Sequence, residues 1–171
     1  MIERAKKHIY HGDGKGKTTA AVGLCARACC YGNRILFCSF LKNDTAGEMK
    51  SLKKLGIATE AVAGRDFTWN LTESEMSQLR IKITDFFISL ESKANDFNMI
   101  ILDEVLDAVD LSLLPENLLI DFLDSHPDIE IVMTGRNPSA SVIALSDYVT
   151  EMKMQKHPFN DKVSAREGIE M

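Results

Sequence analysis

Residues 11–19 of the chain read His11-Gly12-Asp13-Gly14-Lys15-Gly16-Lys17-Thr18-Thr19. A short apolar stretch, residues 9–10, precedes this loop, and an alanine-rich helical pattern over residues 20–31 follows it. A glycine-rich loop between a strand and a helix, ending in Gly-Lys-Thr, is typical of phosphate-binding loops (P-loops). The stretch therefore predicts a site for the triphosphate of a nucleotide.

Each residue type in this loop has a physical role in holding phosphate. Glycines let the backbone turn tightly enough for several N–H groups to converge on one anion, and the following helix adds its positive N-terminal end. We expect Lys17 to reach the terminal phosphates and the Thr18 hydroxyl to bind a bridging Mg²⁺ ion. The predicted nucleotide-binding residues of the loop are Gly12, Asp13, Gly14, Lys15, Gly16, Lys17, Thr18 and Thr19.

The spacing within the loop differs from the standard P-loop pattern. That pattern places its first glycine where this chain has His11, so the loop that starts at Gly12 is shorter. The alternative is a glycine-rich turn with an incidental lysine, but the strand before the loop and the helix after it favour the P-loop. We therefore expect a nucleotide that is held in an unusual way.

Length and composition indicate one domain that binds small ligands. The chain has 171 residues, of which 45% are hydrophobic, so we expect a single core and one domain over residues 1–171. A net charge of -5 gives no electrostatic case for binding nucleic acid or an anionic membrane. No apolar run approaches the roughly 18 residues of a membrane span, and the amino end does not resemble a signal peptide. We expect a cytoplasmic protein.

The four cysteines do not have the spacing of metal ligands. They are Cys25, Cys29, Cys30 and Cys38. Thiols in a reducing compartment stay unpaired, so we expect all four to be free and buried rather than redox-active.

Strand-like and helix-like segments alternate along the chain. The expected strands are residues 9–10, 35–40, 57–62, 99–102, 129–134 and 148–156, and the expected helices are residues 20–31, 46–55, 72–97 and 115–123. The third helix begins at a capping box of Thr72 and Glu75, and its apolar stripe predicts packing against the core. The alternation predicts a three-layer α/β fold, with helices on both faces of a mostly parallel sheet and ligands bound at the carboxyl ends of the strands.

Two of the expected strands end in residues that suit a phosphate site. The strand over residues 99–102 leads into Asp103 and Glu104, which in a nucleotide fold places an acid beside Mg²⁺, and spacing alone does not decide which is the closer ligand. The strand over residues 129–134 leads through Gly135 to Arg136, whose guanidinium suits phosphate oxygens. Strands also end in acidic turns for structural reasons, and Arg136 can instead face solvent or cap a helix.

A loop between the third strand and the third helix contains Phe67, Thr68 and Trp69, the last being the only tryptophan of the chain. Two aromatic side chains in a loop are often anchors that pack into the core. Near a nucleotide site they can instead contact a flat, largely apolar second substrate. The residues alone leave both interpretations open.

These motifs, taken in order over nearly the whole chain, resemble the ATP:corrinoid adenosyltransferase family of vitamin B12 metabolism. The matching stretches are residues 12–19, Phe67-Thr68-Trp69, Leu102-Asp103-Glu104, Thr134-Gly135-Arg136, Lys156-His157-Pro158-Phe159 and Gly168-Ile169-Glu170. The resemblance implies the fold of recombinase-type P-loop proteins. It also implies that cobalt(I) of a corrinoid attacks the 5′ carbon of ATP and expels triphosphate, with ATP reversed in the loop relative to ordinary P-loop enzymes.

The resemblance also implies roles for individual residues. Lys17 and Glu104 would act on the triphosphate, with Mg²⁺ held through Thr18, Glu104 and Asp103. Phe67 and Trp69 would bind the corrinoid and displace its lower axial ligand, so that cobalt(II) is reduced more easily. The implied partners are ATP, a corrinoid such as cobalamin or cobinamide, an electron-donor protein such as a flavodoxin, and a second copy of the chain in a homodimer.

Two other functions use the same predicted pocket. An ATPase or kinase would perform ordinary phosphoryl transfer, with Glu104 orienting water or a hydroxyl group. A regulatory protein would bind nucleotide and corrinoid without turnover. The products of a reaction with MgATP and a reduced corrinoid distinguish the three.

Overall fold

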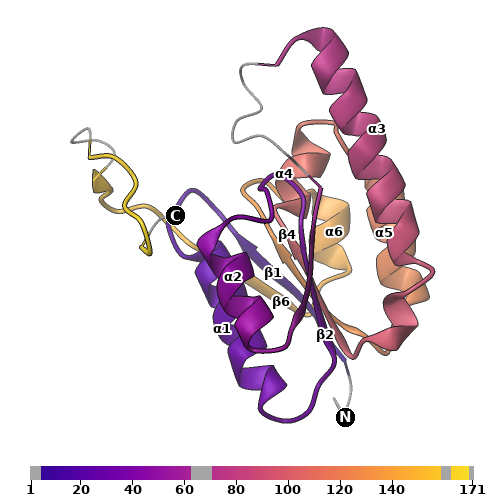
Figure 1. Cartoon of the computed structure of the whole chain (residues 1–171). Helices are drawn as coiled ribbons and strands as arrows, with labels where there is room; N and C mark the ends of the chain where they lie inside the picture. The colour runs from indigo at the N-terminus through magenta and orange to yellow at the C-terminus, as the bar shows by residue number, and fades with distance from the viewer. Residues whose placement is uncertain (1–4, 63–70, 159–162, 170–171) are drawn as a thin grey trace.

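The computed structural model describes residues 5–62, 71–158 and 163–169 of the chain (Figure 1). Within these residues the strands form one sheet of order β3-β2-β4-β5-β1-β6, and every neighbouring pair is parallel. The strands are β1 (Lys7–His11), β2 (Ile35–Ser39), β3 (Ala58–Ala61), β4 (Met99–Asp103), β5 (Glu130–Thr134) and β6 (Tyr148–Glu151). The predicted parallel sheet is confirmed.

Helices cover both faces of the sheet, which confirms the three-layer α/β prediction (Figure 1). One face packs against α1 (Lys17–Cys29) and α2 (Gly47–Lys54). The other face packs against α3 (Glu73–Leu90), α4 (Val105–Asp110), α5 (Glu116–Ser125) and α6 (Ala140–Ala144). A short 3₁₀ helix, η2 (Ala94–Asp96), follows α3.

Strand β2 shows why the sequence gives this layering. Ile35 and Phe37 belong to the core beneath α1 and α2, whereas Leu36 and Cys38 belong to the core beneath α3 and α5. Side chains alternate across a strand, so a strand that is buried on both faces is apolar throughout. The nearly continuous apolar run in the sequence is the signature of this position.

The third helix begins as predicted and ends earlier. Thr72 and Glu75 form both hydrogen bonds of the capping box at the start of α3. The helix ends at Leu90, and the chain reaches residue 97 through η2 rather than as one helix. Ile83, Leu90 and Ala94 are nevertheless fully buried in the core, which confirms that the apolar stripe is a packing surface.

Short elements account for the other differences from the predictions. Helices α4 and α6 were not predicted, because they span only 6 and 5 residues, too few for a periodic pattern to identify. Strand β6 ends at Glu151 instead of residue 156, because the chain there leaves the sheet to contact the P-loop. Helix α1 begins at Lys17, so the loop's lysine is itself the first helical residue.

The expectation of buried cysteines holds for two residues. All four cysteines are free, and Cys25 and Cys38 are buried, so burial raises the pKa of Cys25 to about 12. Cys29 is half-buried and Cys30 is exposed, which is contrary to the prediction; Cys29 is the last residue of α1 and Cys30 is its C-cap. None of the described helices is long and apolar enough to cross a membrane.

Candidate nucleotide site at the carboxyl edge of the sheet

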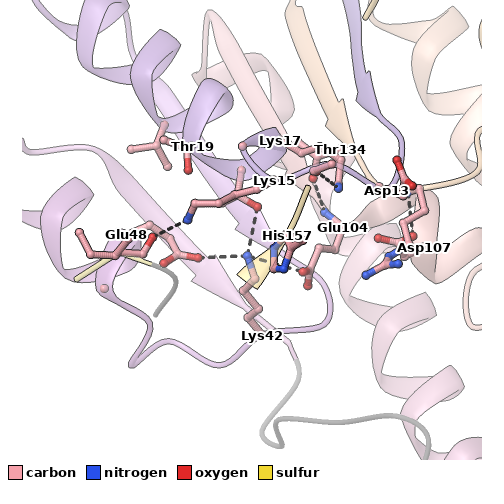
Figure 2. Close-up of a pocket in the computed structure, with 18 of the residues that line it drawn as sticks. Asp13, Lys15, Lys17, Thr19, Lys42, Glu48, Glu104, Asp107, Thr134 and His157 are labelled. Carbon is pink, nitrogen blue, oxygen red and sulfur yellow. Dashed lines mark hydrogen bonds and ion pairs between the residues drawn. The ribbon is translucent and has the colours of Figure 1, made fainter. Parts of the chain in front are cut away.

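A cavity of about 530 Å³ lies at the carboxyl ends of the strands, as the fold class predicts (Figure 2). Strands β1, β4 and β5 are neighbours in the sheet, so the loops that follow them meet at this edge. The predicted site residues that line the cavity are Asp13, Gly14, Lys15, Gly16, Lys17, Thr18, Thr19, Glu104 and Arg136. Lining residues that the site prediction missed include Lys42, Glu48, Asp107, Thr134 and His157.

The first two glycines of the P-loop seat it against the chain that follows β6. A Cβ atom on Gly12 or Gly14 would lie 2.5 or 2.6 Å from the carbonyl oxygen of Met152. The Gly14 N–H donates to that carbonyl (2.7 Å), and the Gly12 N–H donates to the carbonyl of Arg136 (3.2 Å). These two N–H groups are therefore occupied by backbone carbonyls and set the shape of the loop.

Asp13 strengthens the same contact. Its Oδ1 accepts a hydrogen bond from the backbone N–H of Met154 (3.0 Å). This bond is the main reason that the pKa of Asp13 lies below its ordinary value. Because residues 13 and 154 are so distant in the sequence, nothing near Asp13 indicates this partner.

The two lysines of the loop have different partners. Lys17 Nζ donates to the carbonyl oxygens of Gly12 (2.7 Å) and Gly14 (2.8 Å), so its ammonium group lies inside the curve of the loop. Burial lowers the pKa of Lys17, and the nearby charge of Arg136 lowers it further. Lys15 Nζ donates to the carbonyl of Ile169 (2.9 Å), which brings the carboxyl-terminal segment to the cavity.

Asp103 is the fully buried carboxylate of the site. Its Oδ1 accepts hydrogen bonds from the hydroxyl groups of Thr18 (2.9 Å) and Thr134 (2.7 Å). Thr134 Oγ1 in turn accepts a hydrogen bond from the backbone N–H of Glu104 (2.8 Å). The threonine at the end of β5 thus fixes both acids at the end of β4.

Glu104 has a backbone conformation that is rare for its residue type. Its φ is 63°, in the left-handed region, and such outliers concentrate at functional sites. The side chain lines the cavity, and its Oε2 atom is buried without a hydrogen-bond partner among the described residues. Burial raises the pKa of Glu104 to about 7, with Lys42 opposing the shift and Asp103 adding to it.

The oxygen atoms at this edge fit a magnesium ion. The described residues contain no cluster of three or more His, Cys, Asp or Glu side chains arranged for a metal. Mg²⁺ does not require such a cluster, because it prefers one or two protein carboxylates and fills its remaining coordination positions with phosphate oxygens and water. The Thr18 hydroxyl, the Asp103 carboxylate and the orphaned Glu104 oxygen supply that donor set.

Lys42 is the principal residue that the sequence analysis missed. It follows β2, and its Nζ lies 3.1 Å from Thr18 Oγ1 and 3.1 Å from Glu48 Oε1. The same atom lies 3.2 Å from Asp103 Oδ2. It also lies 3.5 Å from Glu104 Oε1, and Figure 2 shows Lys42 between Glu48 and Glu104. Burial alone would lower the pKa of Lys42, but the three carboxylates outweigh it and hold that pKa above its ordinary value. The only sequence signal was its place just after a buried strand.

Arg136 lies at the mouth of the cavity with an exposed side chain. Its backbone N–H donates to Asp107 Oδ1 (2.8 Å), which ties the loop after β5 to α4. Gly135 makes this approach possible, because a Cβ there would lie 2.5 Å from the Leu106 Cβ. The side chain is exposed and lines the cavity, and its contact with phosphate stays a prediction. Phe67 and Trp69 lie outside the described residues.

A parallel sheet with a glycine-rich loop and lysine after β1, and an acid after β4 beside the loop's threonine, defines a P-loop nucleotide-binding protein. The particular family follows from the sequence. The profile of the ATP:corrinoid adenosyltransferases BtuR/CobO/CobP matches residues 3–171, and the chain belongs to that family.

Individual relatives agree with this assignment. The chain is 29% identical over 170 residues to the corrinoid adenosyltransferase of Escherichia coli K12, which covers 98% of this chain and 86% of that protein. It is 30% identical over 171 residues to the corrinoid adenosyltransferase CobA of Salmonella typhimurium, with the same coverage. Among solved structures, a KaiC-like protein from Pyrococcus horikoshii has a TM-score of 0.54 at 12% identity, covering 90% of this chain and 74% of that one, which supports the fold.

Replacing Gly14 with alanine tests the contact between the P-loop and the segment after β6. The added Cβ would collide with backbone atoms of Met152 and Lys153, so we expect G14A to lose about 1–3 kcal/mol of stability and to bind MgATP more weakly. Urea unfolding and calorimetric titration measure the two effects.

Gly23 provides the matched control. It is exposed within α1, and a Cβ there meets no atom of the described chain within 4 Å beyond the helix's own backbone. Alanine favours helix, so G23A should gain about 0.5–1 kcal/mol and keep nucleotide affinity. Equal stabilities of G14A and G23A would contradict the predicted collision.

Thr134→Val tests the hydroxyl that joins the two acids. Valine keeps the shape but leaves the Glu104 N–H and one Asp103 oxygen without this partner, so we expect a loss of about 1–3 kcal/mol in urea unfolding. Thr134→Ser retains the hydroxyl and removes one methyl group, so its loss should be about 1 kcal/mol or less. If serine is as damaging as valine, packing and not hydrogen bonding explains the effect.

Proposed function

We propose that this chain transfers the 5′-deoxyadenosyl group of ATP to the cobalt(I) ion of a corrinoid and releases triphosphate. The observation that carries the proposal is the family match over residues 3–171 together with a cavity in which Lys17, Thr18 and Glu104 meet. The family and the relatives give no support to the alternative of an ATPase or kinase.

The reaction places few demands on acid-base chemistry. Cobalt(I) supplies the electron pair of the new cobalt–carbon bond, and the bond between the 5′ carbon and its oxygen breaks, with its electron pair leaving on triphosphate. The nucleophile has no proton to lose, so no general base is required. The protein must instead stabilise negative charge that develops on the leaving group, which preorganised donors do most effectively.

Lys17 is the principal candidate for that task. In the described structure its ammonium group is satisfied by two loop carbonyls, and a triphosphate oxygen would be a stronger, charged acceptor. Lys15 and Arg136 line the same cavity and add positive charge there. We assign nucleotide binding to residues 12–19 and Arg136, with Gly12 and Gly14 acting through the shape of the loop.

Thr18, Glu104 and Asp103 are the proposed magnesium ligands. Mg²⁺, when bound, neutralises part of the charge on the triphosphate. Glu104 lines the cavity with a buried, unpartnered oxygen and is therefore the candidate for direct contact. Asp103 is fully buried, and its Oδ1 accepts from the Thr18 hydroxyl. We therefore propose Glu104 as the closer of the two acidic ligands.

The corrinoid side of the reaction remains a proposal drawn from the family resemblance. Phe67 and Trp69 would wall the corrinoid site with apolar rings, which offer cobalt no donor atom after its lower ligand leaves. We also propose that cobalamin, cobinamide or a related corrinoid is the substrate and that a flavodoxin-like protein supplies the electron. A homodimer working in the cytoplasm completes the proposal.

Product analysis tests the activity. Incubation with MgATP and chemically reduced cobalamin should yield triphosphate and a light-sensitive cobalt–carbon compound. Lys17→Met removes one preorganised donor, so we expect it to lower the rate by about two orders of magnitude. Release of ADP and phosphate would overturn the proposal in favour of phosphoryl transfer, and tight binding without products would favour a regulator.

Trp69→Ala tests the proposed aromatic wall. If Trp69 promotes loss of the lower cobalt ligand, the variant should lose more activity when a mild reductant must convert cobalt(II) to cobalt(I) than when cobalt(I) is supplied ready-made. Rates under the two conditions, each relative to the unmodified protein, give the comparison. Equal losses would assign Trp69 to corrinoid binding alone.

A further inference from the structure

Lys42 places a positive charge where the proposed metal site needs one. Its Nζ lies within hydrogen-bonding distance of Thr18 Oγ1 and Asp103 Oδ2, at 3.1 and 3.2 Å, and forms an ion pair with Glu104 at 3.5 Å. These are the three side chains assigned to Mg²⁺. Lys42 therefore contacts all three proposed ligands, although it follows β2 and they lie at the start of α1 and at the end of β4.

A magnesium ion bound by these side chains would compete with the ammonium group. Mg²⁺ binds oxygen at about 2.0–2.1 Å and requires near-octahedral geometry, so at Thr18 Oγ1 and Asp103 Oδ2 it would take lone pairs that now accept from Lys42, whereas Glu104 can offer its unpartnered Oε2. Two cations between the same carboxylates would also repel each other strongly in a site of low dielectric constant. Entry of the metal thus requires Lys42 to withdraw.

Glu48 supplies the position to which Lys42 can withdraw. It lies on α2, its Oε1 is 3.1 Å from Lys42 Nζ, and it is not part of the proposed metal set. Both residues line the cavity, so a lysine that rotates away from Asp103 while it keeps Glu48 would face the space available to the triphosphate. The long, flexible side chain of lysine permits such a movement.

We propose that Lys42 is a built-in counter-ion of the metal site, which holds Thr18, Asp103 and Glu104 together in the nucleotide-free protein and moves onto the triphosphate when Mg²⁺ enters with ATP. The inference rests on the metal ligands assigned under the proposed function. Lys42 then weakens the binding of free Mg²⁺ to the protein. A metal ion without nucleotide must displace the ammonium group from the carboxylates, and it brings no other anion for that group to contact. The MgATP complex brings Mg²⁺ for the carboxylates and a triphosphate for the Lys42 ammonium group at the same time.

Binding of Mn²⁺, a paramagnetic substitute for Mg²⁺, tests the proposal without nucleotide or corrinoid. Lys42→Met keeps the length of the side chain and removes its charge, so Mn²⁺ titrated into the nucleotide-free variant should bind about tenfold tighter or more than to the unmodified protein, as followed by electron paramagnetic resonance. Lys50→Met is the matched control, because it removes an exposed lysine from α2 and should leave Mn²⁺ affinity unchanged.

Thermal unfolding gives a second readout. Without metal, K42M should unfold at a lower temperature than the unmodified protein because its carboxylates repel one another, and millimolar Mg²⁺ should recover more of that loss than it adds to the unmodified protein. If K42M does not fold without metal, Lys42→Gln replaces it in the Mn²⁺ titration with the same expectation, since its amide can still donate to the carboxylates.

An Mn²⁺ affinity that is unchanged or weaker in the charge-removing variant would overturn the counter-ion role. The test is separable from the proposed function, because failure of adenosyl transfer in the unmodified protein would be seen in product analysis and would not alter the metal titration.

Discussion

The site depends on one buried charge, the carboxylate of Asp103 at the end of the central strand β4. A buried carboxylate is costly unless donors surround it. Here the donors come from three separate parts of the chain, Thr18 at the start of α1, Thr134 at the end of β5 and Lys42 after β2. The requirement to satisfy this group fixes the P-loop helix, two strand ends and a loop relative to one another, and thereby sets the shape of the cavity.

The sequence predicted the features whose signals are local. The P-loop is contiguous, the acids follow an apolar run directly, and the alternation of strands and helices gives the layered fold. The contacts that complete the site were not predictable, because they join distant residues. Lys42 meets Asp103 across 61 positions, and Asp13 meets Met154 across 141. Helices α4 and α6 were missed because their length holds less than two turns of periodic pattern.

The shortened P-loop illustrates how a local deviation is explained by tertiary structure. The sequence showed that the first glycine was displaced, and it suggested only that the nucleotide is held in an unusual way. The structure shows that Gly12 and Gly14 are required because the backbone at Met152 lies against them. Their N–H groups are occupied by carbonyls, so we propose that phosphate binding uses the second half of the loop, next to the start of α1.

The segment after β6 has a consequence for how the protein is made. The Met152 N–H donates to the His11 carbonyl, the Met152 carbonyl accepts from Gly14, and the Met154 N–H donates to Asp13. The loop is therefore translated 141 positions before one of its supports. A nascent chain that has not yet reached residue 152 carries the loop without the partners that give it shape. The loop can take its final form only after β6 and the segment behind it have left the ribosome.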